Sequence, residues 1–158
     1  MTCFLFEFLS GGELHSHVKR KLVINLPMAK TYIAMIICGI HVLHKNQIIY
    51  WDLKLENIML DKLGYLKLID FGLSRKLEEN DWAKTRCGTL GYIAPEVILR
   101  IGHDYKADIW GIGVLLCEML GGFSPFYNDD PQKMYDDTIH CKIKWPTGLN
   151  SVAKHLIS

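Results

Sequence analysis

The sequence predicts a mainly helical α+β fold with one small β-hairpin, and three observations support this prediction. Two short apolar runs, Ile58–Leu60 and Tyr65–Ile69, flank a turn in which Gly64 can supply a positive φ angle. Apolar residues recur with a period of 3.6 between residues 27 and 45, which predicts an amphipathic helix. The longest apolar helix candidate, Ile109–Leu120, is too short to span a bilayer and predicts a buried core helix.

The elements before the hairpin carry their own local signals. The run Phe4–Leu9 is apolar and ends in a Gly-Gly pair, so the residues alone predict an edge strand and a turn. A short helix is expected to begin with Glu13–Val18. In the long helix that follows, Asn25 is the N-cap, Pro27 lies in the first turn, and Asn46 is the C-terminal stop.

The composition is that of an ordinary globular protein. The 158 residues, 49% of them hydrophobic, are enough for one domain with its own core. The net charge of +1 gives no electrostatic reason to expect nucleic acid or a membrane surface as a partner. No signal peptide is evident, and five scattered cysteines are an odd number. These features favour reduced thiols and a cytoplasmic location.

Polar residues cluster at the two ends of the hairpin. Asp52, Lys54 and Asn57 precede it, and Asp70 follows it. A hairpin brings its ends together, so we expect Asn57 and Asp70 to be neighbours. Carboxylate and amide oxygens are hard ligands that suit Mg²⁺, and a nearby lysine suits a phosphate group.

These residues lie in two motifs that resemble a known enzyme family. Tyr50–Asn57 reads Y-W-D-L-K-L-E-N and resembles the H-R-D-x-x-x-x-N catalytic loop of eukaryotic protein kinases, and Asp70-Phe71-Gly72 resembles their D-F-G metal loop. The run Cys87–Glu96 is similar to the end of a kinase activation segment, with the A-P-E ending. Its Cys-Gly-Thr spelling is similar to that of the AGC group, which includes the cyclic-nucleotide-dependent kinases.

The resemblance implies a serine/threonine kinase that transfers a phosphoryl group from ATP with the help of Mg²⁺. Asp52 would accept or orient the proton of the substrate hydroxyl, and Lys54 would neutralise charge on the transferring group. Asn57 and Asp70 would hold Mg²⁺. Thr89 would form hydrogen bonds with Asp52 and Lys54.

Further site residues are implied by the same resemblance. The backbone around Glu7 and Leu9 would bind adenine, Met59 would lie beneath it, and Glu13 would stand at the edge of the nucleotide site. Glu13 also matches, with Glu56 and Glu118, the positions that read basic residues before the target Ser or Thr. This implies basophilic protein substrates. The alternative for each of these glutamates is a surface or capping carboxylate.

Several residues are implied to have structural or regulatory roles. Tyr50 and Phe71 would pack inside the fold, Glu96 would form the A-P-E ion pair, and the loop amides would hold Asp108 beneath the catalytic loop. Thr85 matches the activation-loop phosphosite, where phosphate would add a charge of about −1.5 to −2. An unmodified, exposed threonine is the alternative.

Three substitutions depart from the kinase pattern. Trp51 replaces the arginine that grips the activation-loop phosphate, and an indole offers one donor and no charge, so this coupling should be weaker. Arg75 could supply a remaining grip. Leu55 replaces a proline in the loop, and Leu90-Gly91 replaces a Pro-Glu pair.

The resemblance covers residues 1–158 as part of a kinase domain, from the hinge to an early helix after the substrate-binding helix. No Gly-rich phosphate loop is found, so we expect a C-terminal lobe without its N-terminal lobe or its last helices. These residues alone are expected to be inactive, because nothing would cover ATP. Expected partners besides substrates are a regulatory subunit or a missing N-terminal lobe. The alternatives are a non-catalytic, pseudokinase-like binding module and a truncated gene product.

Overall fold

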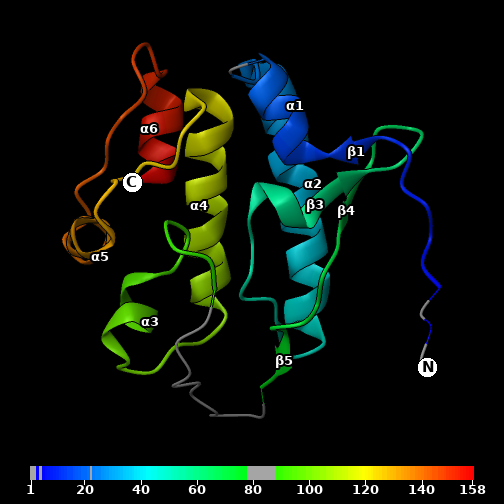
Figure 1. The fold of residues 1–158 in the computed structure, drawn as a ribbon, viewed down its shortest axis with the longest axis horizontal. Helices are drawn as coiled ribbons and strands as arrows, with labels where there is room; N and C mark the ends of the chain where they lie inside the picture. Colours follow the sequence, from blue (N-terminus) through cyan, green and yellow to red (C-terminus); the bar gives the residue numbers. More distant parts are fainter. Residues whose placement is uncertain (1–2, 4, 22, 78–87) are drawn as a thin grey trace.

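Helices and a few short antiparallel strands make up the protein, in a computed structural model that describes residues 3, 5–21, 23–77 and 88–158 (Figure 1). The helices are α1 (Leu14–Lys21), α2 (Leu26–Lys45), α3 (Pro95–Leu99), α4 (Lys106–Gly121), α5 (Pro131–Ile139) and α6 (Ser151–Ile157). The strands are β1 (Gly12–Glu13), β2 (Ile48–Ile49), β3 (Ile58–Leu60), β4 (Leu66–Leu68) and β5 (Arg75–Lys76), with a 3₁₀ turn at Leu55–Asn57. The predicted mixture of helix and small sheet is confirmed.

The core lies where α2 packs against α4 (Figure 1). As predicted, Asn25 caps α2, and its side-chain oxygen accepts a hydrogen bond from the Met28 amide at 3.0 Å. The helix buries one stripe of its surface, formed by Ala29, Ile33, Ile36 and Ile40. Helix α4 contains the predicted core stretch and begins three residues earlier, at Lys106.

The predicted hairpin is present. Strand β3 pairs with β4 in antiparallel register, with Ile58 opposite Leu68 and Leu60 opposite Leu66. Gly64 has φ 86° in the connecting turn, a conformation that glycine adopts without steric cost. Strand β1 adds to the other edge of β3, so the sheet order is β1-β3-β4. The hairpin holds residue 57 and residue 69 together, because the Ile69 amide donates to the Asn57 carbonyl at 2.9 Å.

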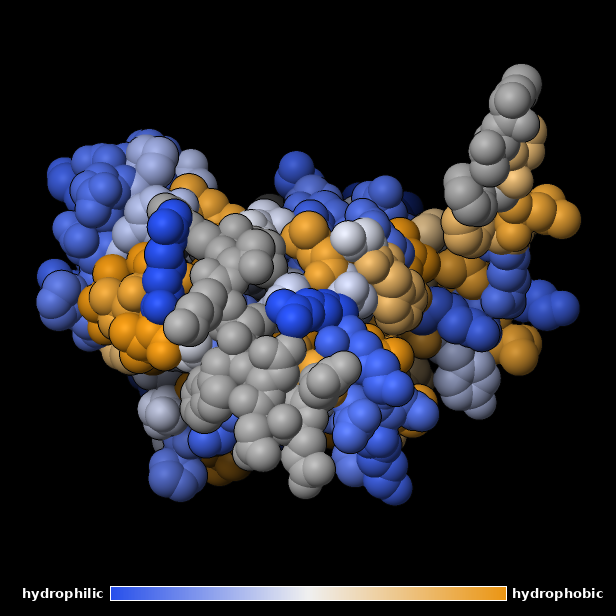
Figure 2. Space-filling view, turned by 90° about the horizontal axis from the view of Figure 1, so that it is seen from below, coloured by the Kyte–Doolittle hydropathy of each residue, from blue (hydrophilic) through white to orange (hydrophobic). Residues whose placement is uncertain are grey.

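The edge strand predicted over Phe4–Leu9 is wrong for the described part of that run. Residues 5–9 form an arm without strand pairing that leads away from the body (Figure 1), and Figure 2 shows hydrophobic surface along it. The central strand β3 already has neighbours on both edges, and pairing starts at the glycines instead. A side chain at Gly11 would lie 2.5 Å from the Leu60 Cβ atom, so only glycine fits there. The following helix begins at Leu14 rather than Glu13.

The longest apolar helix is α2, not the stretch 109–120 as predicted. Among the described residues, α2 alone is long and apolar enough to cross a membrane by length and composition. The core helix of a soluble protein passes the same test, and the buried stripe of α2 packs against α4 and β4.

Candidate active site

The loop Tyr50–Asn57 is fixed to the start of α4 by a buried carboxylate. Asp108 is 1% exposed, and its two oxygens accept hydrogen bonds from the amides of Tyr50 and Trp51, both at 2.9 Å. The Nε2 atom of His44, in the last turn of α2, lies 2.8 Å from the same carboxylate. These contacts give the buried Asp108 the partners that it needs, and they tie the loop to both core helices.

Asp52 lies at the centre of a hydrogen-bond network. Lys54 Nζ donates to its Oδ2 atom at 2.8 Å, Asn57 Nδ2 donates to the same atom at 2.8 Å, and Thr89 Oγ1 donates to Oδ1 at 2.7 Å. Lys54 Nζ also donates to Thr89 Oγ1 at 2.9 Å. The structure therefore brings together four of the predicted site residues, although Thr89 is distant in sequence.

The network keeps Asp52 ionised. Burial alone would raise the pKa of this carboxyl, which is 8% exposed. The hydrogen bonds from Lys54, Thr89 and Asn57, together with the positive charge of Lys54, outweigh burial and hold the pKa of Asp52 below its ordinary value. Asp52 is thus a charged acceptor at neutral pH, although its own side chain is largely buried.

The two predicted metal ligands lie at the joined ends of the hairpin. Asn57 is buried and Asp70 is exposed, and Asp70 accepts a hydrogen bond from the Gly72 amide at 3.0 Å through Oδ1. Within the described ranges, no group of three or more His, Cys, Asp or Glu side chains could hold a metal by itself. A single carboxylate and an amide fit Mg²⁺ in the mode in which substrate phosphates and water complete its shell.

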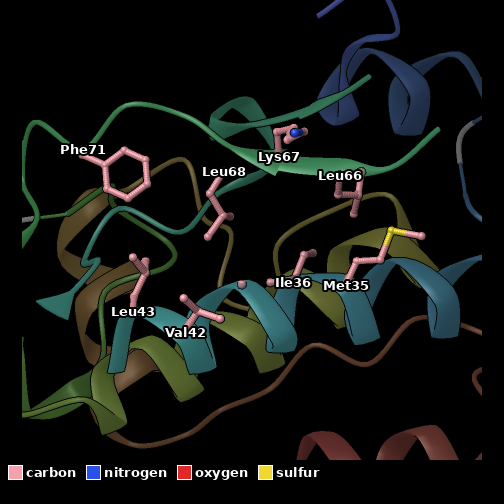
Figure 3. A pocket seen from close by; sticks show the side chains of 9 residues that line it. Met35, Ile36, Val42, Leu43, Leu66, Lys67, Leu68 and Phe71 are labelled. Carbon is pink, nitrogen blue, oxygen red and sulfur yellow. The ribbon is translucent and has the colours of Figure 1, made fainter. Parts of the chain in front are cut away.

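Tyr50 and Phe71 connect the loop to a groove. Tyr50 is fully buried, its hydroxyl donates to the Ile69 carbonyl, and its ring meets the Phe71 ring edge-on at 5.4 Å. Burial raises the pKa of the Tyr50 hydroxyl, so it stays a donor. Phe71 is 50% exposed and lines an apolar groove of about 310 Å³ between α2 and β4, beside Leu43 and Leu68 (Figure 3).

Two of the three predicted substrate-reading glutamates lie close together. The Tyr92 hydroxyl donates to Glu118 Oε2. Burial raises the pKa of Glu118, and the nearby charge of Glu56 raises it further. Glu56 Oε1 lies 3.6 Å from His15 Nε2, whereas its Oε2 atom is buried and has no hydrogen-bond partner among the described residues. Glu13 is exposed on β1.

The remaining predicted residues are dispersed. Glu7 and Leu9 lie on the arm before β1, with Glu7 Oε2 3.6 Å from Lys67 Nζ, and Met59 is half-buried in β3. Glu96 is half-buried in α3 and forms no ion pair within the described part of the chain. Thr85 lies outside the described residues.

Sequence reasoning missed three side chains that contact the site. His44 contacts Asp108, Tyr92 contacts Glu118, and the ring of His103 lies 5.1 Å from that of Trp51. A buried Asp108 indicates that some donor must reach it, but nothing in the sequence selects one of seven histidines. For Tyr92 and His103 we find no local signal.

Comparison with known proteins gives the class of this one. The protein kinase domain family matches residues 1–158, and the chain belongs to that family. Its relatives are AGC-type serine/threonine kinases. It is 44% identical over 153 residues to the human (Homo sapiens) cAMP-dependent protein kinase catalytic subunit PRKX, covering 97% of this chain and 42% of that protein. It is 45% identical over 154 residues to the serine/threonine-protein kinase sck2 of Schizosaccharomyces pombe, covering 96% and 24%.

The chain spans less than half the length of these relatives. A third relative, the cAMP-dependent protein kinase catalytic subunit of Dictyostelium discoideum, is 40% identical over 153 residues, and the chain covers 23% of it. Kinases of this family generally use ATP and Mg²⁺.

Proposed function

We propose that residues 1–158 are the C-terminal lobe of a serine/threonine protein kinase and carry its catalytic base and metal ligands. The observation that supports this most is the network in which Lys54, Asn57 and Thr89 all donate to Asp52. An ionised, oriented carboxylate beside a lysine is what a substrate hydroxyl needs in order to lose its proton as it attacks a phosphoryl group.

Each side chain has one role in the proposed reaction. Asp52 orients the substrate hydroxyl and takes its proton as the oxygen attacks phosphorus. Lys54, already bonded to Asp52, places its positive charge where negative charge develops. Asn57 and Asp70 would hold Mg²⁺. When bound, ATP would supply the phosphoryl group, and Mg²⁺ would neutralise part of its negative charge.

The assignment to a C-terminal lobe is supported by the groove between α2 and β4. Its lining is mainly apolar, with Lys67 among the lining residues, and Phe71, from the predicted metal loop, is half exposed within it. A surface where large exposed apolar side chains lie side by side usually marks a site that another part of a protein covers. We propose that another part of a kinase domain covers this groove, and that the adenine contacts around Glu7, Leu9, Glu13 and Met59 are completed on the same side.

We further propose that the substrates carry basic residues near the target Ser or Thr. Glu56 Oε2 is buried without a hydrogen-bond partner in the described structure, which is costly for a carboxylate. Glu56 lies near enough to Glu118 for its charge to help raise the pKa of the Glu118 carboxyl. The guanidinium of a substrate arginine would satisfy both carboxylates with a forked set of donors, which a neutral side chain could not provide.

Replacing Glu56 with glutamine is expected to raise KM for an arginine-containing peptide. The loss of a charge-assisted hydrogen bond of about 1.5–3 kcal/mol corresponds to roughly a 10- to 150-fold change. Steady-state kinetics with paired peptides, one with arginine and one with norleucine before the serine, would measure it. Asp136→Asn, on the exposed surface of α5, is the control. An equal KM for both peptides in the unmodified protein would overturn the proposed preference.

As the pH is lowered, the affinity for a basic peptide is expected to decline. This decline should begin at a higher pH than it would for a glutamate with an ordinary pKa. Burial raises the pKa of Glu118, so this carboxyl takes up a proton earlier as the pH is lowered, and its attraction for a cation is lost. Binding measured by calorimetry from neutral to mildly acidic pH should show this decline, and Glu118→Gln should remove it. The same decline in the Glu118→Gln protein would contradict the assignment.

A non-catalytic binding module is the second candidate function, and Trp51 is the observation that favours it. A neutral indole replaces the arginine expected at this position of the loop. One experiment distinguishes the two functions. The full-length protein is incubated with Mg·ATP and the arginine-containing serine peptide. We expect phosphate on the serine. A module would bind the peptide equally well after Asp70→Ala and transfer no phosphate.

The location and the assembly of the protein remain proposals. The described cysteines Cys3, Cys38, Cys117 and Cys141 are free thiols, which supports the proposed cytoplasmic location. Two of the relatives are named catalytic subunits, which implies that they assemble with other subunits. By analogy, we propose a regulatory subunit as a partner of this chain.

A further inference from the structure

Trp51 adopts a backbone conformation that a bulky residue rarely adopts. Its φ angle is 69°, in the left-handed region, and the residue that follows is Asp52. Such a conformation persists only when its surroundings hold it, and it often marks a functional position. One contact that holds it is the hydrogen bond from the Trp51 amide to Asp108 Oδ1 at 2.9 Å.

A second contact comes from His103, in the loop between α3 and α4. This side chain is 1% exposed, and its ring centroid lies 5.1 Å from that of the Trp51 indole, with the planes tilted by 59°. Across the residues that the structure describes, neither ring nitrogen of His103 nor Nε1 of Trp51 has a hydrogen-bond partner. The two rings therefore meet through packing alone, an arrangement that favours a neutral imidazole.

Trp51 also contacts the segment that carries Thr89. A Cβ atom on Gly88 would lie 3.0 Å from the Trp51 carbonyl oxygen, so the two backbones approach closely, and Gly88 has φ 104°. The next residue, Thr89, donates to Asp52 Oδ1 at 2.7 Å. Trp51 thus contacts His103 through its ring and Gly88 and Asp108 through its backbone, and it directly precedes Asp52 in the chain.

We propose that His103 is a positioning residue for phosphoryl transfer, whose neutral ring holds Trp51 and thereby keeps the Asp52 carboxylate oriented toward the substrate hydroxyl. This inference rests on the proposed kinase function. In this proposal, the packing of His103 against Trp51 holds the loop Tyr50–Asn57 in place. Trp51 occupies the position where the kinase pattern has a positively charged arginine.

The charges around His103 help set the pH at which its ring becomes charged. Burial lowers the pKa of His103, and the carboxylates of Glu96 in α3, Asp104 in the same loop and Asp108 in α4 counteract burial only in part. The ring is therefore neutral at and above the ordinary histidine range. As the pH falls through that range, the unfolded chain binds a proton first, so stability declines until the folded ring is also protonated. Protonation places an unpaired charge against the indole.

The test compares His103→Ala and His103→Phe in the full-length protein. His103→Ala should lower kcat about 10- to 100-fold, the scale expected for a misplaced catalytic group, while KM for ATP stays unchanged. His103→Phe keeps a ring against Trp51, so it should recover kcat and remove the loss of activity at acid pH. Phe126→Ala is the matched control, because Phe126 is another buried ring, stacked on Trp110 at 5.3 Å.

A second readout does not depend on catalysis. The indole N–H resonance of Trp51, assigned through Trp51→Phe, should shift with pH in the unmodified protein and lose this titration in His103→Phe. If the protein transfers phosphate but His103→Ala lowers kcat no more than Phe126→Ala, or if the acid decline persists in His103→Phe, the positioning role is overturned by itself. If the unmodified protein transfers no phosphate while the Trp51 resonance titrates, the proposed function has failed and the positioning role fails with it.

Discussion

Replacing Asp52 with asparagine is expected to lower kcat for phosphoryl transfer by about 100- to 10,000-fold, the range for loss of a general base. Asparagine has nearly the same volume, and its oxygen can still accept from Lys54 or Thr89. It cannot take a proton from the substrate hydroxyl. The fold and KM for ATP should therefore change little, and the loss should lie in kcat.

Single-turnover measurement with saturating Mg·ATP and the arginine-containing peptide would isolate the chemical step. Asp136→Asn makes the same chemical change on the exposed face of α5 and should leave kcat unaltered. A thermal unfolding curve for each variant would separate a lost base from a damaged fold. A wild-type kcat in a folded Asp52→Asn protein would remove Asp52 from the mechanism.

Asp108→Ala is expected to lower the free energy of unfolding by about 3–5 kcal/mol, as when one member of a buried polar pair is removed. The amides of Tyr50 and Trp51 would lose their acceptor, and His44 would lose its partner. Such buried groups cannot turn to water, so each bears its desolvation cost. Activity should fall too, because the same contacts hold the loop that carries Asp52.

Urea denaturation would measure the change, provided that the slope m is the same in both proteins. Asp130→Ala is the matched control, because the Asp130 carboxylate also accepts from a backbone amide, that of Gln132 at 2.9 Å, but on the surface at the start of α5. Loss of such a helix cap costs about 0.5–2 kcal/mol. If Asp108→Ala lost no more than this control, the loop would not depend on its contact with α4.

Elements with local signals could be predicted from the sequence. The Asn25 cap, the apolar stripe of α2 and the turn at Gly64 are each encoded within a few residues. The run Phe4–Leu9 carries an equally clear local signal, and it misled the prediction, because a strand also needs a pairing partner, which the run itself does not specify. Strand β3 pairs with β1 from Gly12 onward, about 45 residues away in the sequence, and not with residues 5–9.

In the candidate site too, some residues could be predicted from the sequence and others could not. The resemblance indicated Asp52, Lys54, Asn57 and Thr89 as a group, and the structure brings them into one network. It did not indicate the partners that hold them. His44 and Tyr92 act across long separations in sequence, and the contact of His103 with Trp51 depends on how the loop before α4 packs. Packing of this kind leaves no periodic pattern and no motif in the sequence.

The bond between the Ile69 amide and the Asn57 carbonyl has a consequence for motion. It closes the hairpin immediately before Asp70, so the spacing between Asn57 and Asp70 is set by a small local element rather than by the packing of the whole domain. A hairpin forms within microseconds, whereas domain motions and lid opening extend to milliseconds and longer. Slow rearrangements elsewhere can therefore open or close access to the site while the backbone of residues 57 and 69 stays paired.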